Sequence, residues 1–402
     1  MYSISGNMSL RVAIVGGGLG GLAAALFLRK AGVDASVFEQ SSGLREVGAG
    51  IVVSPNMVRP LARLGLLARL ETFAVRLEAA WEFRRWKDGR VLSVQPMGEA
   101  CRALYGTNCY VAHRADLHAM FREALPAGTL QLDQRCVGVE QDGQGVSLTF
   151  ESRDGQRTTR HADAVIAADG IHSTLRSAVV SASDAQHEPR FSGLCAFRCL
   201  VPAASAPEMA LRPVQTLWLG AGHHFVHYPV SAGRFVNVVA MAPAGEWRTE
   251  SWNAEGRVED LMGEFEGWDP RVAQLITSAT DTRRWALYDR EPLSRWVNGR
   301  LALLGDAAHA MLPFFGQGAA QAVEDAEALA LCLAGVGTDA VGEALKRYDS
   351  ARLPRASKVQ RMSRGREVQN HLPDGPEQAQ RDAGFAGGDP LRQSAWLYEY
   401  NA

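Results

Sequence analysis

The first regular pattern in the chain is a short apolar run followed by a helical repeat. Residues Arg11–Val15 read RVAIV, which is typical of a buried strand, and a cluster of glycines follows at once. The next residues predict a helix over about Leu19–Lys30 that ends at Gly32, and then a second strand over Ala35–Phe38. A strand, a helix and a strand in about 30 residues predict a βαβ unit with a parallel sheet.

Similar patterns return later, interrupted by segments of another kind. A helix is predicted over Leu117–Leu125, strands near Gln131–Val139, Val146–Phe150, Ala164–Ala168 and Leu301–Leu304, and an Ala-rich helix over about Gly318–Leu333. Between them, Trp81–Val94 alternates apolar and polar residues as a half-buried strand does. Phe191–Val201 and Thr216–Met241 have the pattern of antiparallel strands with glycine turns. The sequence therefore predicts an α/β fold, with a discontinuous Rossmann-like domain and an inserted, mainly antiparallel β-sheet domain.

These patterns also set the expected domain boundaries. The nucleotide-binding domain is predicted to comprise residues 9–75, 103–180 and 285–365, and the inserted sheet domain residues 76–102 and 181–284. The last stretch, 366–402, is polar and rich in Gly and Pro, which predicts a loose C-terminal tail until about Trp396–Tyr400.

Composition narrows the class of protein. The 402 residues are 47% hydrophobic and 21% charged, with a formal net charge of −2, so a nucleic-acid binder or a polybasic membrane protein is not expected. No apolar run has the length of a membrane span. The six cysteines form no CxxC pair, so we expect neither a metal site nor a redox dithiol, and a reducing cytoplasm fits best.

The glycine cluster has the spacing Gly16-x-Gly18-x-x-Gly21, between the first strand and the first helix. Glycine is needed there for a tight turn, for close approach of the backbone to a pyrophosphate, and for contact between helix and strand. Glu39 follows the second strand, where a carboxylate accepts hydrogen bonds from ribose hydroxyls. A dinucleotide site is predicted; a glycine-rich packing turn is the alternative.

A long motif in the C-terminal half favours FAD over NAD. GDAAHAMLPFFGQGAAQAVEDA runs from Gly305 to Ala326, directly after a predicted buried strand. Asp306 at the end of that strand is placed to bind a polyol chain, and the helix that begins near Gly318 would direct its positive end at a flavin carbonyl. A third motif, Asp169-Gly170-x-x-Ser173-x-x-Arg176, follows another strand.

These three motifs, in this order, resemble those of the single-component FAD-dependent aromatic hydroxylases, over roughly Leu10 to Lys358. The resemblance implies that Asp306 binds the ribityl chain of FAD, that Glu39 binds the adenosine ribose, and that Arg114 contacts the polar part of the cofactor. For Arg114 a bridging ion pair, and for Asp169 a structural turn, are the alternatives. The full set of expected FAD-binding residues is Gly16, Gly18, Leu19, Gly21, Glu39, Gln40, Arg114, Cys136, Asp169, Asp306, Gly316, Gln317, Gly318 and Ala319.

The resemblance also implies a reaction. No second GxGxxG is found, which fits a family in which NADH or NADPH binds transiently and reduces FAD. The reduced flavin then forms a hydroperoxide with O2 and hydroxylates a small phenolic or N-heteroaromatic acid. Arg190–Pro202 is most similar to salicylate hydroxylase and Tyr288–His309 to 3-hydroxybenzoate 6-hydroxylase, so the exact substrate stays open, as do decarboxylation and a homodimeric state.

The candidate catalytic residues lie in the segment Gly222–Pro229. Side chains alternate along a strand, so His224 and Tyr228 share one face and His223 and His227 the other. By resemblance to the family, His224 is expected to be the base or phenol anchor and Tyr228 a hydrogen-bond partner of the substrate.

Several alternatives remain at this point. His224 and Tyr228 could be ordinary strand residues, and His309 in the GDAAH motif is expected to have a structural role. Other candidate functions are an FAD monooxygenase acting on a non-phenolic substrate, a non-catalytic flavin-binding protein, and an NAD-dependent dehydrogenase.

Overall fold

A mainly parallel sheet holds the N-terminal βαβ unit. The computed structural model describes residues 9–43, 49–180, 188–249, 254–385 and 387–402. The strands of this six-stranded sheet lie in the order β19 (Val297–Asn298), β20 (Leu301–Leu303), β12 (Ala164–Ala167), β1 (Arg11–Val15), β2 (Asp34–Phe38) and β8 (Leu130–Gln131). All neighbours pair in parallel except β19 and β20. The strand, helix and strand predicted at the start of the chain are present, with β1 in the interior of the sheet.

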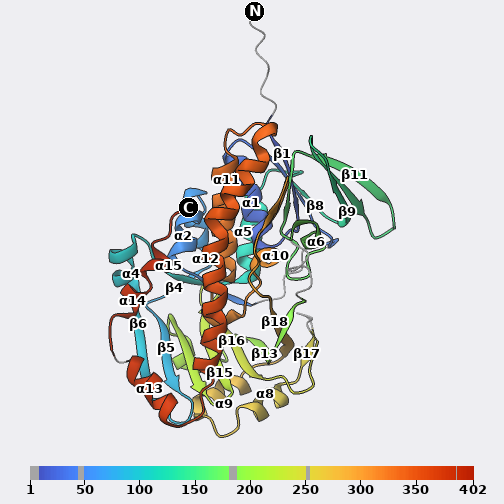
Figure 1. Ribbon diagram of the computed structural model, residues 1–402. Coiled ribbons are helices and arrows are strands. Elements are labelled where there is room, and N and C mark those ends of the chain that lie inside the picture. The colour runs from blue at the N-terminus through green and yellow to red at the C-terminus, as the bar shows by residue number, and fades with distance from the viewer. Residues whose placement is uncertain (1–8, 44–48, 181–187, 250–253, 386) are drawn as a thin grey trace, which may run out of the picture.

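Three helices form the layer beside this sheet, and a fourth lies against them. They are α1 (Leu19–Lys30), α5 (Arg114–Ala124), α11 (Gly318–Leu333) and α12 (Val341–Asn370). Helix α1 packs on α11 and α5, and α11 packs on α12. The small residues of α1 permit this close packing: a Cβ on Gly20 would lie 2.8 Å from Cδ2 of Leu304. Helix α12 is long enough to run alongside both halves of the molecule (Figure 1).

An eight-stranded sheet forms the other half of the molecule (Figure 1). Its strands lie in the order β17 (Glu255–Gly256), β18 (Thr282–Asp289), β13 (Arg190–Pro202), β16 (Phe235–Pro243), β15 (His223–Val230), β14 (Val214–Gly220), β5 (Ala79–Arg85) and β6 (Val91–Pro96). Every neighbouring pair is antiparallel except β14 and β5. The antiparallel strands predicted over Phe191–Val201 and Thr216–Met241 are therefore confirmed.

The single strand predicted over Trp81–Val94 is wrong. That segment is a hairpin of β5 and β6, and Gly89 in the connection has a φ of +62°. Glycine adopts this left-handed conformation at little cost, and the segment 87–90, which has no apolar side chain, interrupts the alternation at the turn.

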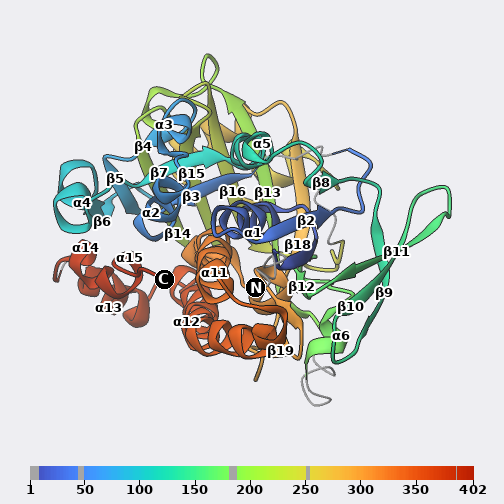
Figure 2. The same ribbon diagram turned by 90° about the horizontal axis from the view of Figure 1, so that it is seen from above.

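Two small sheets and several short helices complete the fold (Figure 2). The sheets contain β3 (Gly50–Val53), β7 (Tyr110–His113) and β4 (Val75–Arg76), and β9 (Arg135–Gln141), β10 (Val146–Glu151) and β11 (Arg157–Ala162). The shorter helices are α2 (Pro55–Arg63), α3 (Leu67–Leu70), α4 (Gly98–Tyr105), α6 (Arg176–Val179), α8 (Val258–Glu264), α9 (Pro270–Thr277), α10 (Asp306–His309), α13 (Pro376–Phe385), α14 (Pro390–Gln393) and α15 (Ala395–Tyr398). Three 3₁₀ turns are η1 (Glu208–Ala210), η2 (Pro313–Phe315) and η3 (Thr338–Ala340). None of the described helices is both long and apolar enough to cross a membrane.

The C-terminal residues differ from the loose tail that their composition predicts. Helix α12 continues to Asn370, and α13 and α14 pack on β6 while α15 packs on α2. Phe385 stacks on Phe83 with ring centroids 4.6 Å apart, and Leu391 and Tyr398 are buried. A few apolar side chains in a polar segment are enough to dock it, because each covers apolar surface of the sheet.

Candidate active site

A cavity of about 740 Å³ is lined by residues of the eight-stranded sheet and of the segments that follow the strands of the parallel sheet. On one side it is bounded by Gly18, Asp169 and Asp306, each of which follows the carboxyl end of a strand of the parallel sheet. Ligands of open α/β sheets bind at this edge because the loops that follow parallel strands converge there. On the other side it is bounded by residues of the eight-stranded sheet, among them His224 and Tyr228.

The glycine motif shapes one end of this cavity. A Cβ on Gly21 would lie 2.0 Å from the carbonyl oxygen of Gly16, and a Cβ on Gly16 would lie 2.3 Å from that of Ala168. Both positions therefore exclude any side chain. Gly18 lines the cavity and a Cβ there would meet nothing within 4 Å, so its backbone is open to a ligand at the N-terminus of α1.

A second helix N-terminus faces the same cavity. Gly316, Gln317, Gly318 and Ala319 line it where α11 begins, and Gly316 has a left-handed backbone with a φ of +61°. The first N–H groups of a helix have no partner within the helix, and its dipole places partial positive charge there. Two helix ends thus face one space, which suits a ligand that carries negative charge at two points.

Polar side chains lie between these two helix ends. Asp306 is exposed to the cavity, and Arg114 lines it as well. Burial lowers the pKa of Arg114, and the charge of Asp306 opposes that change, which places the two groups in electrostatic contact. Asp169 accepts hydrogen bonds from N and Oγ1 of Thr174 at 2.8 and 3.2 Å, while its other carboxylate oxygen is buried without a hydrogen-bond partner in the described structure.

The remaining expected cofactor residues divide into two groups. Leu19 and Gln40 line the cavity, whereas Glu39 and Cys136 do not. The carboxylate of Glu39 accepts hydrogen bonds from N of Gly17 at 2.7 Å and from N of Ser41 at 2.9 Å. Glu39 thus fixes the first turn of the glycine motif from behind.

Strand β15 presents the candidate catalytic residues. His224, Val226 and Tyr228 line the cavity, as the alternation predicts. Tyr228 packs on β3: a Cβ on Gly50 would lie 2.5 Å from its hydroxyl oxygen. Burial lowers the pKa of His224 well below its ordinary value and raises that of Tyr228. At neutral pH, His224 is therefore a neutral imidazole and Tyr228 a protonated phenol.

Comparison with known proteins settles the family. The FAD binding domain family matches residues 9–363. A 3-amino-4-hydroxybenzoate 2-monooxygenase of Streptomyces platensis is 42% identical over 100% of this chain and 98% of its own length. The chain belongs to the FAD-dependent aromatic hydroxylases. A salicylate hydroxylase substrate complex has a TM-score of 0.80 at 31% identity and covers 98% of this chain and 96% of its own. Klebsiella pneumoniae HpxO complexed with FAD and uric acid has a TM-score of 0.85 at 28% identity, covering 99% and 98%.

The cavity of this hydroxylase fits its cofactor. A pyrophosphate needs close backbone approach at a helix N-terminus, and Gly18 provides it. A polyol chain needs carboxylate oxygens that can accept hydrogen bonds from its hydroxyls. Asp306 is exposed to the cavity, and one oxygen of Asp169 has no hydrogen-bond partner in the described structure.

One residue of the hydroxylase site was missed by the sequence reasoning. Arg198 of β13 lines the cavity, with its guanidinium 3.9 Å from the ring centroid of Trp285. Burial lowers the pKa of Arg198 to about 9, which leaves it a cation at pH 7. Alternation along the strand places Arg198 on the same face as Leu194 and Ala196, but only the packing shows that this face borders the cavity, whereas Phe197 lies in the cluster on the other face.

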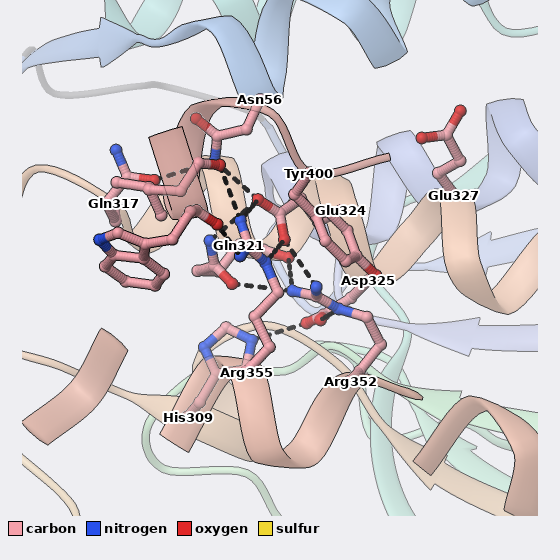
Figure 3. A network of polar contacts seen from close by, with 12 residues as sticks. Asn56, His309, Gln317, Gln321, Glu324, Asp325, Glu327, Arg352, Arg355 and Tyr400 are labelled. Carbon is pink, nitrogen blue, oxygen red and sulfur yellow. Dashed lines mark hydrogen bonds and ion pairs between the residues drawn. The ribbon is translucent and has the colours of Figure 1, made fainter. Parts of the chain in front are cut away.

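A buried polar network holds the start of α11 from behind (Figure 3). Asn56 donates to Oε1 of Gln317 at 3.0 Å and to Oε1 of Glu324 at 2.6 Å. Glu324 also accepts from Arg352 at 2.6 Å and from Arg355 at 2.7 Å. Since Gln317 lines the cavity, these contacts connect α2 and α12 to the cofactor end of the site.

Asp325 extends the network to the loop that carries Asp306. It accepts from N of Gly305 at 3.1 Å and from Nε of Arg352 at 2.8 Å, and it lies 2.6 Å from Nε2 of His309. Burial alone would raise the pKa of Asp325, but the neighbouring His309 and Arg352 lower it. His309 is fully buried and does not line the cavity, which agrees with a structural role for this residue.

Proposed function

We propose that this hydroxylase uses NADH or NADPH and O2 to hydroxylate a small phenolic or N-heteroaromatic acid. The observation that carries the proposal is that His224, Tyr228 and Arg198 line the same cavity as Asp306 and the start of α11. Groups that suit a hydroxylated aromatic acid thus share one space with groups that suit a flavin.

The chemistry of the cavity walls supports an aromatic acid as substrate. Apolar side chains dominate the part formed by the eight-stranded sheet, among them Leu217, Val226, Val239 and Met241, and Phe314 of η2 adds an aromatic ring to the same wall. Arg198 adds a planar cation that can form two parallel hydrogen bonds with a carboxylate. An apolar slot with a cation in its wall selects a flat ring that carries an anionic group. We therefore assign the substrate carboxylate to Arg198.

His224 and Tyr228 are assigned to the substrate hydroxyl. A phenol has a pKa near 10, so forming the more reactive phenolate at pH 7 costs about 4 kcal/mol. Neutral His224 can accept the phenol proton, and general-base catalysis of this kind contributes about 10²–10⁴ in rate. Tyr228, which stays protonated, can donate a hydrogen bond to the developing phenolate oxygen.

FAD, when bound, supplies the activation of O2 with electrons from the nicotinamide. The residues of this chain that would hold FAD lie at the N-termini of α1 and α11 and among the polar side chains near those two helix ends. Gly16, Gly18, Leu19 and Gly21 would shape the pyrophosphate site, Glu39, Gln40 and Cys136 the adenosine side, Arg114, Asp169 and Asp306 the polar chain, and Gly316, Gln317, Gly318 and Ala319 the flavin ring. The same assignment makes 9–75, 103–180 and 285–365 the cofactor domain and 76–102 and 181–284 the substrate domain. Of these ranges, 44–48, 181–187 and 250–253 lie outside the described residues.

The test is oxygen uptake with product identification. Purified enzyme loaded with FAD is given NADH or NADPH and one of 3-amino-4-hydroxybenzoate, salicylate, 3-hydroxybenzoate or 6-hydroxynicotinate, and products are identified by mass. At least one acid should gain an oxygen atom or exchange its carboxylate for a hydroxyl. His224→Gln should lower that rate by about 10²-fold or more, whereas His161→Gln, on the exposed strand β11, should not change it. NADH oxidation that yields only hydrogen peroxide with every acid would refute the proposal.

A further inference from the structure

A histidine from the C-terminal segment reaches the candidate base from behind. His371 follows the last residue of α12, and its Nε2 lies 2.6 Å from Nδ1 of His224. The two rings are stacked, with centroids 4.9 Å apart and planes inclined by 27°. The carbonyl oxygen of His371 also accepts a hydrogen bond from N of Gly222 at 3.0 Å, which anchors this segment to the start of β15.

The pair spans the distance between the cavity and the surface. His224 lines the cavity and is 2% exposed, whereas His371 does not line the cavity and is partly exposed. Phe314 packs edge-on against both rings, at 5.3 Å from His224 and 5.7 Å from His371. Phe314 therefore covers the contact between the two imidazoles, and the partly exposed ring of His371 connects that contact to solvent.

The surroundings disfavour a positive charge on either ring. In the described part of the chain, neither ring contacts a carboxylate. The other titratable group whose charge acts on both rings is His223, on the opposite face of β15, where it lies 2.9 Å from Oε2 of Glu264 on α8. A buried imidazolium without a counter-charge is costly. His224 can thus accept a proton more easily if it gives up its other proton in the same event.

We propose that His371 relays to solvent the proton that His224 takes from the substrate hydroxyl. The inference rests on the proposed role of His224 as the base. The O–H bond of the substrate breaks as Nε2 of His224 gains the proton, and the proton on Nδ1 of His224 passes to Nε2 of His371. His371 releases the proton on its Nδ1 to water, so both rings are neutral before and after. The substrate is left as a phenolate and water has gained one proton.

The test follows phenolate formation directly. The holoenzyme is mixed with 4-hydroxy-3-nitrobenzoate at a pH where the free compound is a phenol, and the coloured phenolate is followed by stopped-flow absorbance. His371→Gln keeps an oxygen that can accept the Nδ1 proton of His224 in a hydrogen bond, but it cannot relay a proton. We expect this variant to bind the probe with unchanged affinity and to form phenolate at least about tenfold more slowly, with partial recovery as a small diffusible buffer is added.

Comparison with His224→Gln separates the two proposals. If His371→Gln forms phenolate at the rate of the unaltered enzyme while His224→Gln is slow, the relay through His371 is wrong and the role of His224 as the base is retained. If His224→Gln is also as fast as the unaltered enzyme, the base assignment fails and the relay fails with it.

A second measurement needs no variant. In mixtures of H2O and D2O, the rate of phenolate formation in the unaltered enzyme should depend on the deuterium fraction along a curve, because more than one proton moves in the step. A straight line would overturn the relay. His161→Gln, which alters a histidine far from the pair in sequence and exposed on β11, should match the unaltered enzyme in every trace.

Discussion

The guanidinium of Arg198 lies over the indole of Trp285, 3.9 Å from the ring centroid, where both side chains line the cavity. The two residues come from neighbouring antiparallel strands, β13 and β18. An aromatic face attracts a cation and keeps a planar guanidinium in one orientation. The site thus contains a cation whose position is set before the substrate arrives.

The first prediction concerns this cation. Arg198→Lys keeps the charge but loses both the planar fork and the stacking on Trp285, so the KM for the aromatic acid should rise by about 10–100-fold, which corresponds to about 1.5–3 kcal/mol for a charged hydrogen bond. Steady-state kinetics measure the change in KM, and titration of the flavin spectrum measures the change in affinity for the acid. A matched phenol without the carboxylate is the control, since its KM should hardly change. Equal weakening of acid and phenol would contradict the assignment.

The second prediction concerns the polar chain of FAD. Asp306→Ala should weaken FAD binding by about 10–100-fold, because it removes a charged acceptor that is exposed to the cavity. Quenching of FAD fluorescence on titration of the apoprotein measures the affinity. Asp339→Ala alters a carboxylate in the turn η3, which does not line the cavity, and should bind FAD as the unaltered protein does. Similar affinities for the two variants would show that Asp306 does not hold the cofactor.

The third prediction concerns the buried network. Arg352 is fully buried between Glu324 and Asp325, so Arg352→Met leaves two buried carboxylates with fewer partners and should lower the free energy of unfolding by about 3–5 kcal/mol. Lys346→Met breaks an exposed ion pair with Glu343 and should cost less than about 1 kcal/mol. Urea unfolding of both variants measures the difference. A loss below about 1 kcal/mol for Arg352→Met would mean that the network contributes little.

The fourth prediction concerns pH. His227 points away from the cavity, is 1% exposed, and has its pKa lowered by burial from 6.5 to about 3. Below pH 6.5 the unfolded chain binds a proton there that the folded chain does not, so stability falls by about 1.4 kcal/mol per pH unit as the pH drops toward the folded value. Above pH 6.5, His227 carries no extra proton in either the folded or the unfolded chain, so it does not change the free energy of unfolding.

His227→Leu should therefore reduce the loss of stability between pH 7 and pH 5 by about 2 kcal/mol. Urea unfolding at the two pH values measures this. The exposed His161 provides the matched control, because His161→Leu should keep the pH dependence of the unaltered protein. If His227→Leu loses as much stability between pH 7 and pH 5 as the unaltered protein, the prediction is wrong.

Local patterns were enough to predict much of the fold. The strand Arg11–Val15 and the helices Leu19–Lys30 and Gly318–Leu333 have the bounds that the sequence indicated, because periodicity and terminal glycines act within a few residues. The shared face of His224 and Tyr228 was predictable for the same reason, since alternation along a strand needs no knowledge of its partners.

Contacts between distant segments were not predictable in this way. Arg198 was one of many arginines until the packing of the two sheets showed which face of β13 borders the cavity. His371 lies in a polar stretch without a clear period, and it meets His224 across 147 residues. The segment is held by contacts that composition does not reveal, such as Arg366 within 6.0 Å of the rings of Phe83 and Phe315. Each of these depends on tertiary packing alone.

The order of the strands in the parallel sheet has a consequence for synthesis. β1 is translated first yet lies in the interior of the sheet, between β2 and β12, and β20 joins beyond β12 only after residue 303. The glycine turn after β1 is therefore available early, but the residues around Asp306 and Gly318 that bound the same cavity leave the ribosome last among its walls. A nascent chain that ends before β20 carries an unfinished sheet edge, and one that ends before α11 lacks a wall of the cavity, so cofactor capture must follow translation of the start of α11.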